Sequence, residues 1–135
     1  TTFKRVIPYS LLKRVFAKFI IPQPKYSNSK NIFLNNAQKV SFESFTGWLK
    51  LGDGLGARIR NLFEENVSIP TLYVMGEDDK LFLPHVRKTV CNSMSGNVSL
   101  AIVPNAGHVC NIDNKSYFNQ LSIDFIERVN RGIAC

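Results

Sequence analysis

The 135-residue chain has no long hydrophobic run, and cysteine, proline and glycine are all scarce in it. No uncharged apolar run approaches the ~20 residues of a membrane-spanning helix, which excludes an integral membrane protein. Eight glycines and six prolines are too few for a collagenous or low-complexity chain. With 44% hydrophobic residues, the chain has the apolar mass of a folded protein, and its length suits one domain or part of one.

The cysteines are few and form no recognisable metal or disulfide pattern. Cys91, Cys110 and Cys135 are an odd number and contain no CxxC motif, which argues against both a disulfide framework and a zinc site. We therefore expect a reducing, cytoplasmic compartment. No secretory signal opens the chain, because Lys4 and Arg5 precede broken apolar stretches.

Acidic residues are missing from residues 1–42, which hold eight Lys or Arg. The remaining residues carry nine basic and ten acidic side chains. This asymmetry predicts a boundary near Ser41 and indicates an anionic partner for the basic segment.

Residues 1–51 are expected to be mainly helical. Apolar residues recur at helical spacing over residues 10–20, with Ser10 as the expected N-cap. The cations Lys13, Arg14 and Lys18 are expected on the other side of that helix. Residues 22–31 are predicted to be a polar loop, and 32–51 a second helical region. Asp53 is a candidate N-cap for a further short helix, through Phe63.

The basic helix at 10–20 has three open interpretations. Its cations form a solvated face, or they attract an anionic substrate or membrane surface, or they bind nucleic acid. Nucleic acid is the least favoured partner, because no recognition motif accompanies the charges.

From Ile69 the pattern changes to short apolar runs that alternate with helical segments. Strands are predicted over 71–75 and 99–103, both buried on their two faces. One helix is expected from Pro84 to Gly96. The closing helix is expected over 116–131, with its inward side formed by Phe118, Leu121, Phe125, Ile126 and Val129. This order predicts a parallel βαβ unit with a closing helix, and hence an α/β fold.

Polar residues follow both predicted strands. The first strand is followed by Glu77, Asp78 and Asp79, and the second by the loop that ends in His108. The carboxyl ends of adjacent parallel strands meet at one edge, so an acid there can reach the imidazole. A carboxylate on one imidazole nitrogen leaves the other nitrogen as a general base, which suits hydrolase chemistry.

Three segments together resemble the C-terminal part of α/β-hydrolase-fold enzymes. They are IPTLYVMGEDD at 69–79, VPNAGH at 103–108, and the Phe-Asn to Phe spacing of 118–125 in the last helix. The resemblance covers about residues 52–131. Residues 1–51 look like the variable helical cap of that family.

The resemblance implies roles for individual residues. Asp79 corresponds to the triad acid, with Asp78 as the alternative and Glu77 as a solvated turn residue. His108 corresponds to the general base, and Gly107 fits a tight approach before it. No serine lies in a G-x-S-x-G motif, so the chain holds two triad members and no nucleophile.

Other polar and aromatic residues near these motifs are expected to have structural roles. We expect a surface position for His85, loop hydrogen bonding by Asn111 and Asp113, and packing by Cys110. The aromatic residues Phe42, Phe45 and Trp48 either pack the junction between cap and core or line an acyl pocket.

The resemblance implies a serine esterase-type acyl hydrolase that acts on a small-molecule ester without metal or organic cofactor. Its partners would be the N-terminal half of the same fold or a second copy of this chain. The alternative is a non-catalytic remnant or interaction module that folds by association with another chain.

Overall fold

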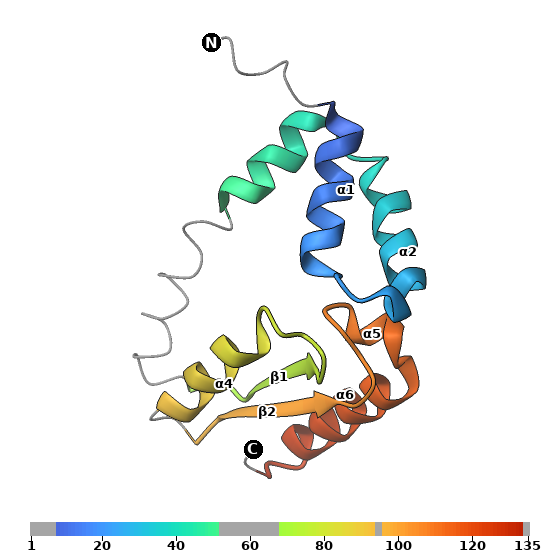
Figure 1. Cartoon of the computed structure of the whole chain (residues 1–135). Coiled ribbons are helices and arrows are strands. Elements are labelled where there is room, and N and C mark those ends of the chain that lie inside the picture. Colours follow the sequence, from blue (N-terminus) through green and yellow to red (C-terminus); the bar gives the residue numbers. More distant parts are fainter. Residues whose placement is uncertain (1–7, 52–67, 94–95, 134–135) are drawn as a thin grey trace. The chain divides into compact units, whose positions relative to one another are not determined.

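The computed structural model describes residues 8–51, 68–93 and 96–133. The chain forms two compact units, Thr1–Gly54 and Leu55–Cys135, and each is described by itself. Figure 1 shows helices in the first unit and a two-stranded sheet with helices in the second. Among the described residues, no helix combines the length and apolarity needed to cross a membrane.

The first helix of the N-terminal unit is α1, Tyr9–Ile20. Its N-cap is Pro8, and the predicted cap Ser10 lies inside the first turn. The Pro8 carbonyl accepts the N–H groups of Leu11 and Leu12, at 2.9 and 3.1 Å. The helix therefore begins earlier than predicted and without a side-chain cap.

The predicted loop over 22–31 is wrong from Pro24 onward. Pro24–Tyr26 forms a 3-10 turn, η2, which leads directly into α2, Ser27–Ala37. Proline favours a first helical turn because its φ is fixed and it has no N–H to satisfy. The chain is helical again over residues 42–51, so the helical region predicted over 32–51 consists of two helices that residues 38–41 separate. Ser41 Oγ accepts the N–H of Ser44 at this restart, in the manner of an N-cap.

Aromatic rings form the contacts inside the N-terminal unit. The Phe16 ring centroid lies 5.9, 5.6 and 6.0 Å from those of Phe33, Phe45 and Trp48. The pairs with Phe45 and Trp48 are edge-on, at 89° and 84°, and such pairs add to the stability gained by burial. Phe45 is buried and Trp48 is exposed, and both pack within their own unit.

Lys13 departs from the predicted solvated face of α1. It is buried, with Nζ 4.0 Å from the Tyr9 ring centroid and 3.4 Å from the Ala37 carbonyl oxygen. The ring and the carbonyl replace part of the water that the ammonium loses. Only Arg14 and Lys18 of the three α1 cations are exposed.

The C-terminal unit has the predicted order of strand, helix, strand and closing helix. Its elements are β1 Thr71–Gly76, α4 Leu83–Asn92, β2 Val98–Val103, α5 Cys110–Asp113 and α6 Lys115–Asn130. The strands pair in parallel, from Thr71 opposite Val98 to Gly76 opposite Val103. Figure 1 shows α4 on one side of the strands and α6 on the other. The mixed α/β architecture is thus confirmed.

The helix ends follow their local sequence signals. α4 has Pro84 in its first turn and ends at Asn92, before the predicted Gly96. α6 ends before Gly132, which has a φ of +70° as expected of a helix-terminating glycine. The predicted short helix after Asp53, and Met94 of the predicted Pro84 helix, lie outside the described residues.

The strands are less buried than predicted. Residues 71–75 and 98–102 are half-buried, and only the last residues, Gly76 and Val103, are buried. Ile126 of α6, predicted to face inward, is exposed. Within the described residues the sheet has two strands, and each has a neighbour on one edge only. The strands are less buried than predicted for this reason.

We expect this chain to be ordered only in association with another segment or copy. A parallel pair with unpaired apolar edges is a template for a further strand and is weak by itself. Size-exclusion chromatography with light scattering measures the oligomeric state of the 135-residue chain. A cooperatively melting monomer at low micromolar concentration would show that no further strand is needed.

Candidate active site

The parallel register brings the loops after β1 and β2 together. Gly76 lies opposite Val103 at the carboxyl ends of the strands. Beyond the strands, the Glu77 N–H donates to the Val103 carbonyl oxygen and the Asp78 N–H to that of Ala106, both at 2.9 Å. These bonds hold the acidic loop and the histidine loop against each other.

Gly76 is the residue whose lack of a side chain permits this approach. A Cβ atom at this position would overlap the Gly107 carbonyl oxygen and come within 2.5 Å of that of Ala106. We predicted a tight approach at Gly107, and the Gly107 carbonyl oxygen is indeed one of the atoms that leave no room for a side chain at residue 76.

Side-chain hydrogen bonds hold the loop that carries His108. Asn105 has a φ of 52°, which asparagine tolerates better than most residues, and its N–H donates to Glu77 Oε2 at 3.1 Å. The Gly107 N–H donates to Asp113 Oδ2 at 2.8 Å, and Asn114 Nδ2 donates to the Pro104 carbonyl oxygen at 3.0 Å. The expected loop hydrogen bonding by Asp113 is therefore confirmed. Glu77 is exposed as predicted, and its carboxylate also accepts the Asn105 N–H of the neighbouring loop.

Asp79 and His108 meet at this edge of the sheet. Asp79 Oδ2 lies 2.9 Å from His108 Nδ1, although the two residues are 29 positions apart. The Asp79 side chain is 2% exposed and that of His108 is 32% exposed. The carboxylate is therefore shielded from water, whereas part of the imidazole remains accessible.

The backbone of the following turn fixes the Asp79 carboxylate. Its Oδ1 accepts the N–H of Phe82 at 3.0 Å, which leaves Oδ2 directed at the imidazole. The Phe82 ring also lies 4.7 Å from the His108 ring, tilted by 33°. Phe82 thus contacts both members of the pair. Sequence reasoning missed it, although an aspartate followed three residues later by an aromatic residue at a helix start is a usable signal.

This geometry suits a general base. A neutral imidazole that donates its Nδ1 proton to a carboxylate has its lone pair on Nε2. In the described part of the chain, no hydrogen bond occupies Nε2. The His108 bond goes to Asp79 and not to Asp78, while His85 is exposed on α4 as expected.

Cys110 is a packing residue, as expected. It is buried with Val103 and Ala106, and Val74, Phe118 and Leu121 pack against these three. Its Sγ donates to the Val74 carbonyl oxygen at 3.6 Å. Burial raises the pKa of the Cys110 thiol, which disfavours the nucleophilic thiolate.

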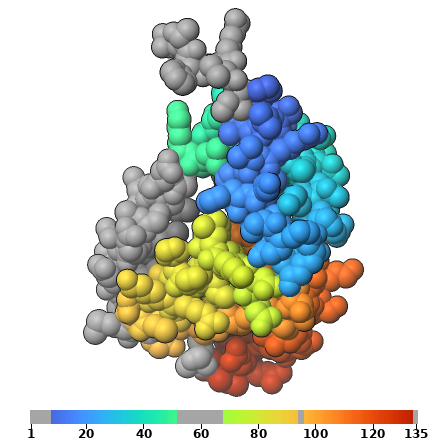
Figure 2. Space-filling model, in the orientation of Figure 1, coloured from blue at the N-terminus to red at the C-terminus, as the bar shows by residue number. Residues whose placement is uncertain are grey.

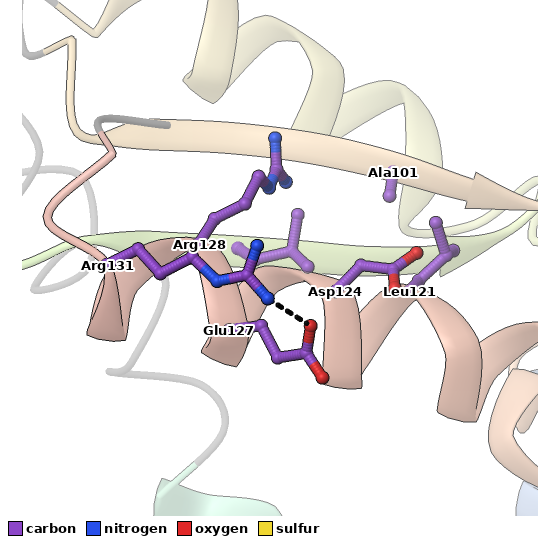
Figure 3. Close-up of a pocket in the computed structure, with 7 residues that line it drawn as sticks. Ala101, Leu121, Asp124, Glu127, Arg128 and Arg131 are labelled. Atoms are coloured by element: carbon purple, nitrogen blue, oxygen red, sulfur yellow. Dashed lines mark hydrogen bonds and ion pairs between the residues drawn. The ribbon is translucent and has the colours of Figure 1, made fainter.

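Neither Asp79 nor His108 lines the cavity of about 430 Å³ that Figure 3 shows. Its apolar lining comes from Leu72, Ala101 and Leu121. Three charged α6 residues, Asp124, Glu127 and Arg128, and the C-cap residue Arg131 complete it. Arg131 pairs with Glu127 at 3.3 Å. The cavity is therefore lined by other residues than the Asp79–His108 pair at the strand ends.

No cluster of three or more His, Cys, Asp or Glu residues suited to a metal occurs among the described residues. Comparisons with protein families, curated proteins and solved structures find no match to this chain.

Substituting Gly76 tests the close approach of the loops. We expect Gly76→Ala to lower the free energy of unfolding by about 2–3 kcal/mol, because the added methyl group meets backbone atoms that cannot rotate away. Gly96→Ala is the control, since Gly96 belongs to the same unit and nothing lies within 4 Å of the added Cβ. Urea unfolding measures both, and an unchanged Gly76→Ala midpoint would contradict the steric argument.

Alkylation tests the different environments of the two described cysteines. In a Cys135→Ser background, iodoacetamide at about pH 7.5 should modify exposed Cys91 at least tenfold faster than buried Cys110. The reason is that the raised pKa of Cys110 leaves it protonated and burial restricts access. Mass spectrometry of the modified peptides gives both rates, and urea should make them similar. Equal rates in the folded chain would show that Cys110 is reactive.

Proposed function

We propose that this chain is the C-terminal part of an α/β-hydrolase, a serine esterase-type acyl hydrolase. In this proposal Asp79 orients His108, and Nε2 of His108 removes the proton from a serine hydroxyl. The substrate is a small-molecule carboxylic ester or a similar acyl compound.

The single observation that supports this proposal is the 2.9 Å contact between Asp79 Oδ2 and His108 Nδ1 at adjacent strand ends. The carboxylate is almost fully shielded from solvent, so little water competes with the imidazole for its Oδ2. The second anchor of the carboxylate, the Phe82 N–H, limits its rotation. These features match what a histidine base requires of its acid partner.

The nucleophile and the oxyanion donors of the proposed site come from residues outside this sequence. None of the serines here lies in a G-x-S-x-G motif, which in this fold precedes the acid and the histidine along the chain. The same observation favours the second candidate function, a non-catalytic interaction module. A protein product with such a motif upstream of Thr1 supports the enzyme, and a natural chain without one supports the module.

Hydrolysis of p-nitrophenyl esters tests the role of the histidine. In the longest natural product that contains this chain, His108→Ala should lower kcat/KM on the order of 10⁴-fold or more. His85→Ala is the matched control, because His85 is exposed on α4. The isolated 135-residue chain should be inactive. Equal losses in both variants, or turnover by the isolated chain that requires His108, would contradict the proposed roles.

Charge-neutral variants of the two aspartates test the acid. Asp79→Asn should lower kcat on the order of 10⁴-fold, because the amide no longer holds the imidazole in the productive tautomer. Asp78→Asn should have a mild effect, since the bond to His108 comes from Asp79. A larger loss in Asp78→Asn would assign the acid to that residue instead.

A further inference from the structure

The outer face of α1 carries an apolar row that nothing in the described part of its unit covers. The row consists of Leu11, Val15 and Phe19, which are 49%, 58% and 61% exposed. A spacing of four residues places them one above another along about 12 Å of helix. The opposite face already supplies the buried contacts, through Lys13, Ala17 and Ile20. The apolar row is therefore additional to the packing that the unit needs.

A basic row lies beside the apolar row on the same exposed face. It consists of Arg14 and Lys18, each one position before a member of the apolar row. No acidic residue stands in α1, and Glu43 is the one acid among residues 8–51, against seven Lys or Arg. The positive potential of this face is therefore hardly compensated by the segment itself.

We propose that α1 binds an anionic lipid bilayer, with the apolar row at the acyl boundary and the basic row among the phosphates. Amphipathic helices that lie in a membrane surface combine these two features. Burial of Leu, Val and Phe side chains provides the affinity, and the cations restrict binding to anionic lipid. This inference is independent of the proposed hydrolase activity.

Nucleic acid suits this face less well than a bilayer. It would use the cations but leave three large apolar side chains in water. Contact of the apolar row with protein is the alternative that the emission measurement below distinguishes. Figure 2 shows the surface of α1, in blue, on the face drawn.

Vesicle co-sedimentation of the full chain tests the basic row. Binding should be strong to phosphatidylcholine vesicles with about 30% phosphatidylserine, weak to pure phosphatidylcholine, and weaker at high salt. Arg14→Gln with Lys18→Gln should reduce the partition coefficient about tenfold or more. Lys39→Gln with Lys50→Gln removes the same charge from exposed sites elsewhere and should have a much smaller effect. Equal losses would indicate a response to net charge alone and overturn the assignment to α1.

Substitutions in the apolar row test whether these side chains enter the bilayer. Replacing Leu11, Val15 and Phe19 together by Gln should abolish most binding, because nothing remains to enter the acyl boundary. The control is Ile123→Gln with Ile126→Gln, which removes exposed apolar side chains from α6. Circular dichroism checks that both retain the wild-type helix content. Loss of binding in the α6 control alone would contradict the proposal.

Insertion depth separates a membrane from the other occupants. In a Trp48→Phe background, a Phe19→Trp variant should shift its emission to the blue and be quenched by brominated lipid. Asn31→Trp on the exposed side of α2 should do neither. Phe19→Trp emission that is already blue-shifted without vesicles and unchanged by them would place the row against protein. Either that result or unquenched emission in bound protein would overturn the proposal.

Discussion

The parallel pairing of β1 with β2 is the constraint on which the C-terminal unit depends. Its register sets Gly76 opposite Val103, so the two loops leave the sheet at the same edge. Backbone bonds from Glu77 and Asp78 then join the loops. A slip of one residue would turn every strand side chain to the other face and separate the loops. The position of the Asp79–His108 pair thus follows from the pairing of two short strands.

Around the pair, most polar contacts serve to hold loops in place. Hydrogen bonds with the side chains of Asp113, Asn114 and Glu77 fix the backbone of the histidine loop. The Phe82 N–H fixes the Asp79 carboxylate. Such support is what a base needs, because a displaced imidazole loses its alignment with the reacting group. In the proposed hydrolase, this chain supplies the part of the triad that orients and moves the proton.

The N-terminal unit has a different character. Its interior depends on aromatic rings around Phe16 and on the buried Lys13, and its outer face combines apolar and basic residues. Burial of Lys13 leaves the basic row to Arg14 and Lys18. The proposed membrane contact therefore concerns a face defined by helix periodicity, whereas the proposed catalytic pair depends on the sheet.

The order of elements in residues 69–131 could be predicted from the sequence, because buried strands and amphipathic helices have different apolar periods. It also singled out Asp79 and His108 as residues that follow strands. The close approach at Gly76 and the contact between the Phe82 and His108 rings could not be predicted, because each joins loops that are distant in sequence. The same holds for Lys13, whose helical position indicated solvent, whereas packing against the Tyr9 ring and the Ala37 carbonyl buries it. Local periodicity predicts which residues share a face, but the neighbours of that face decide whether it is buried.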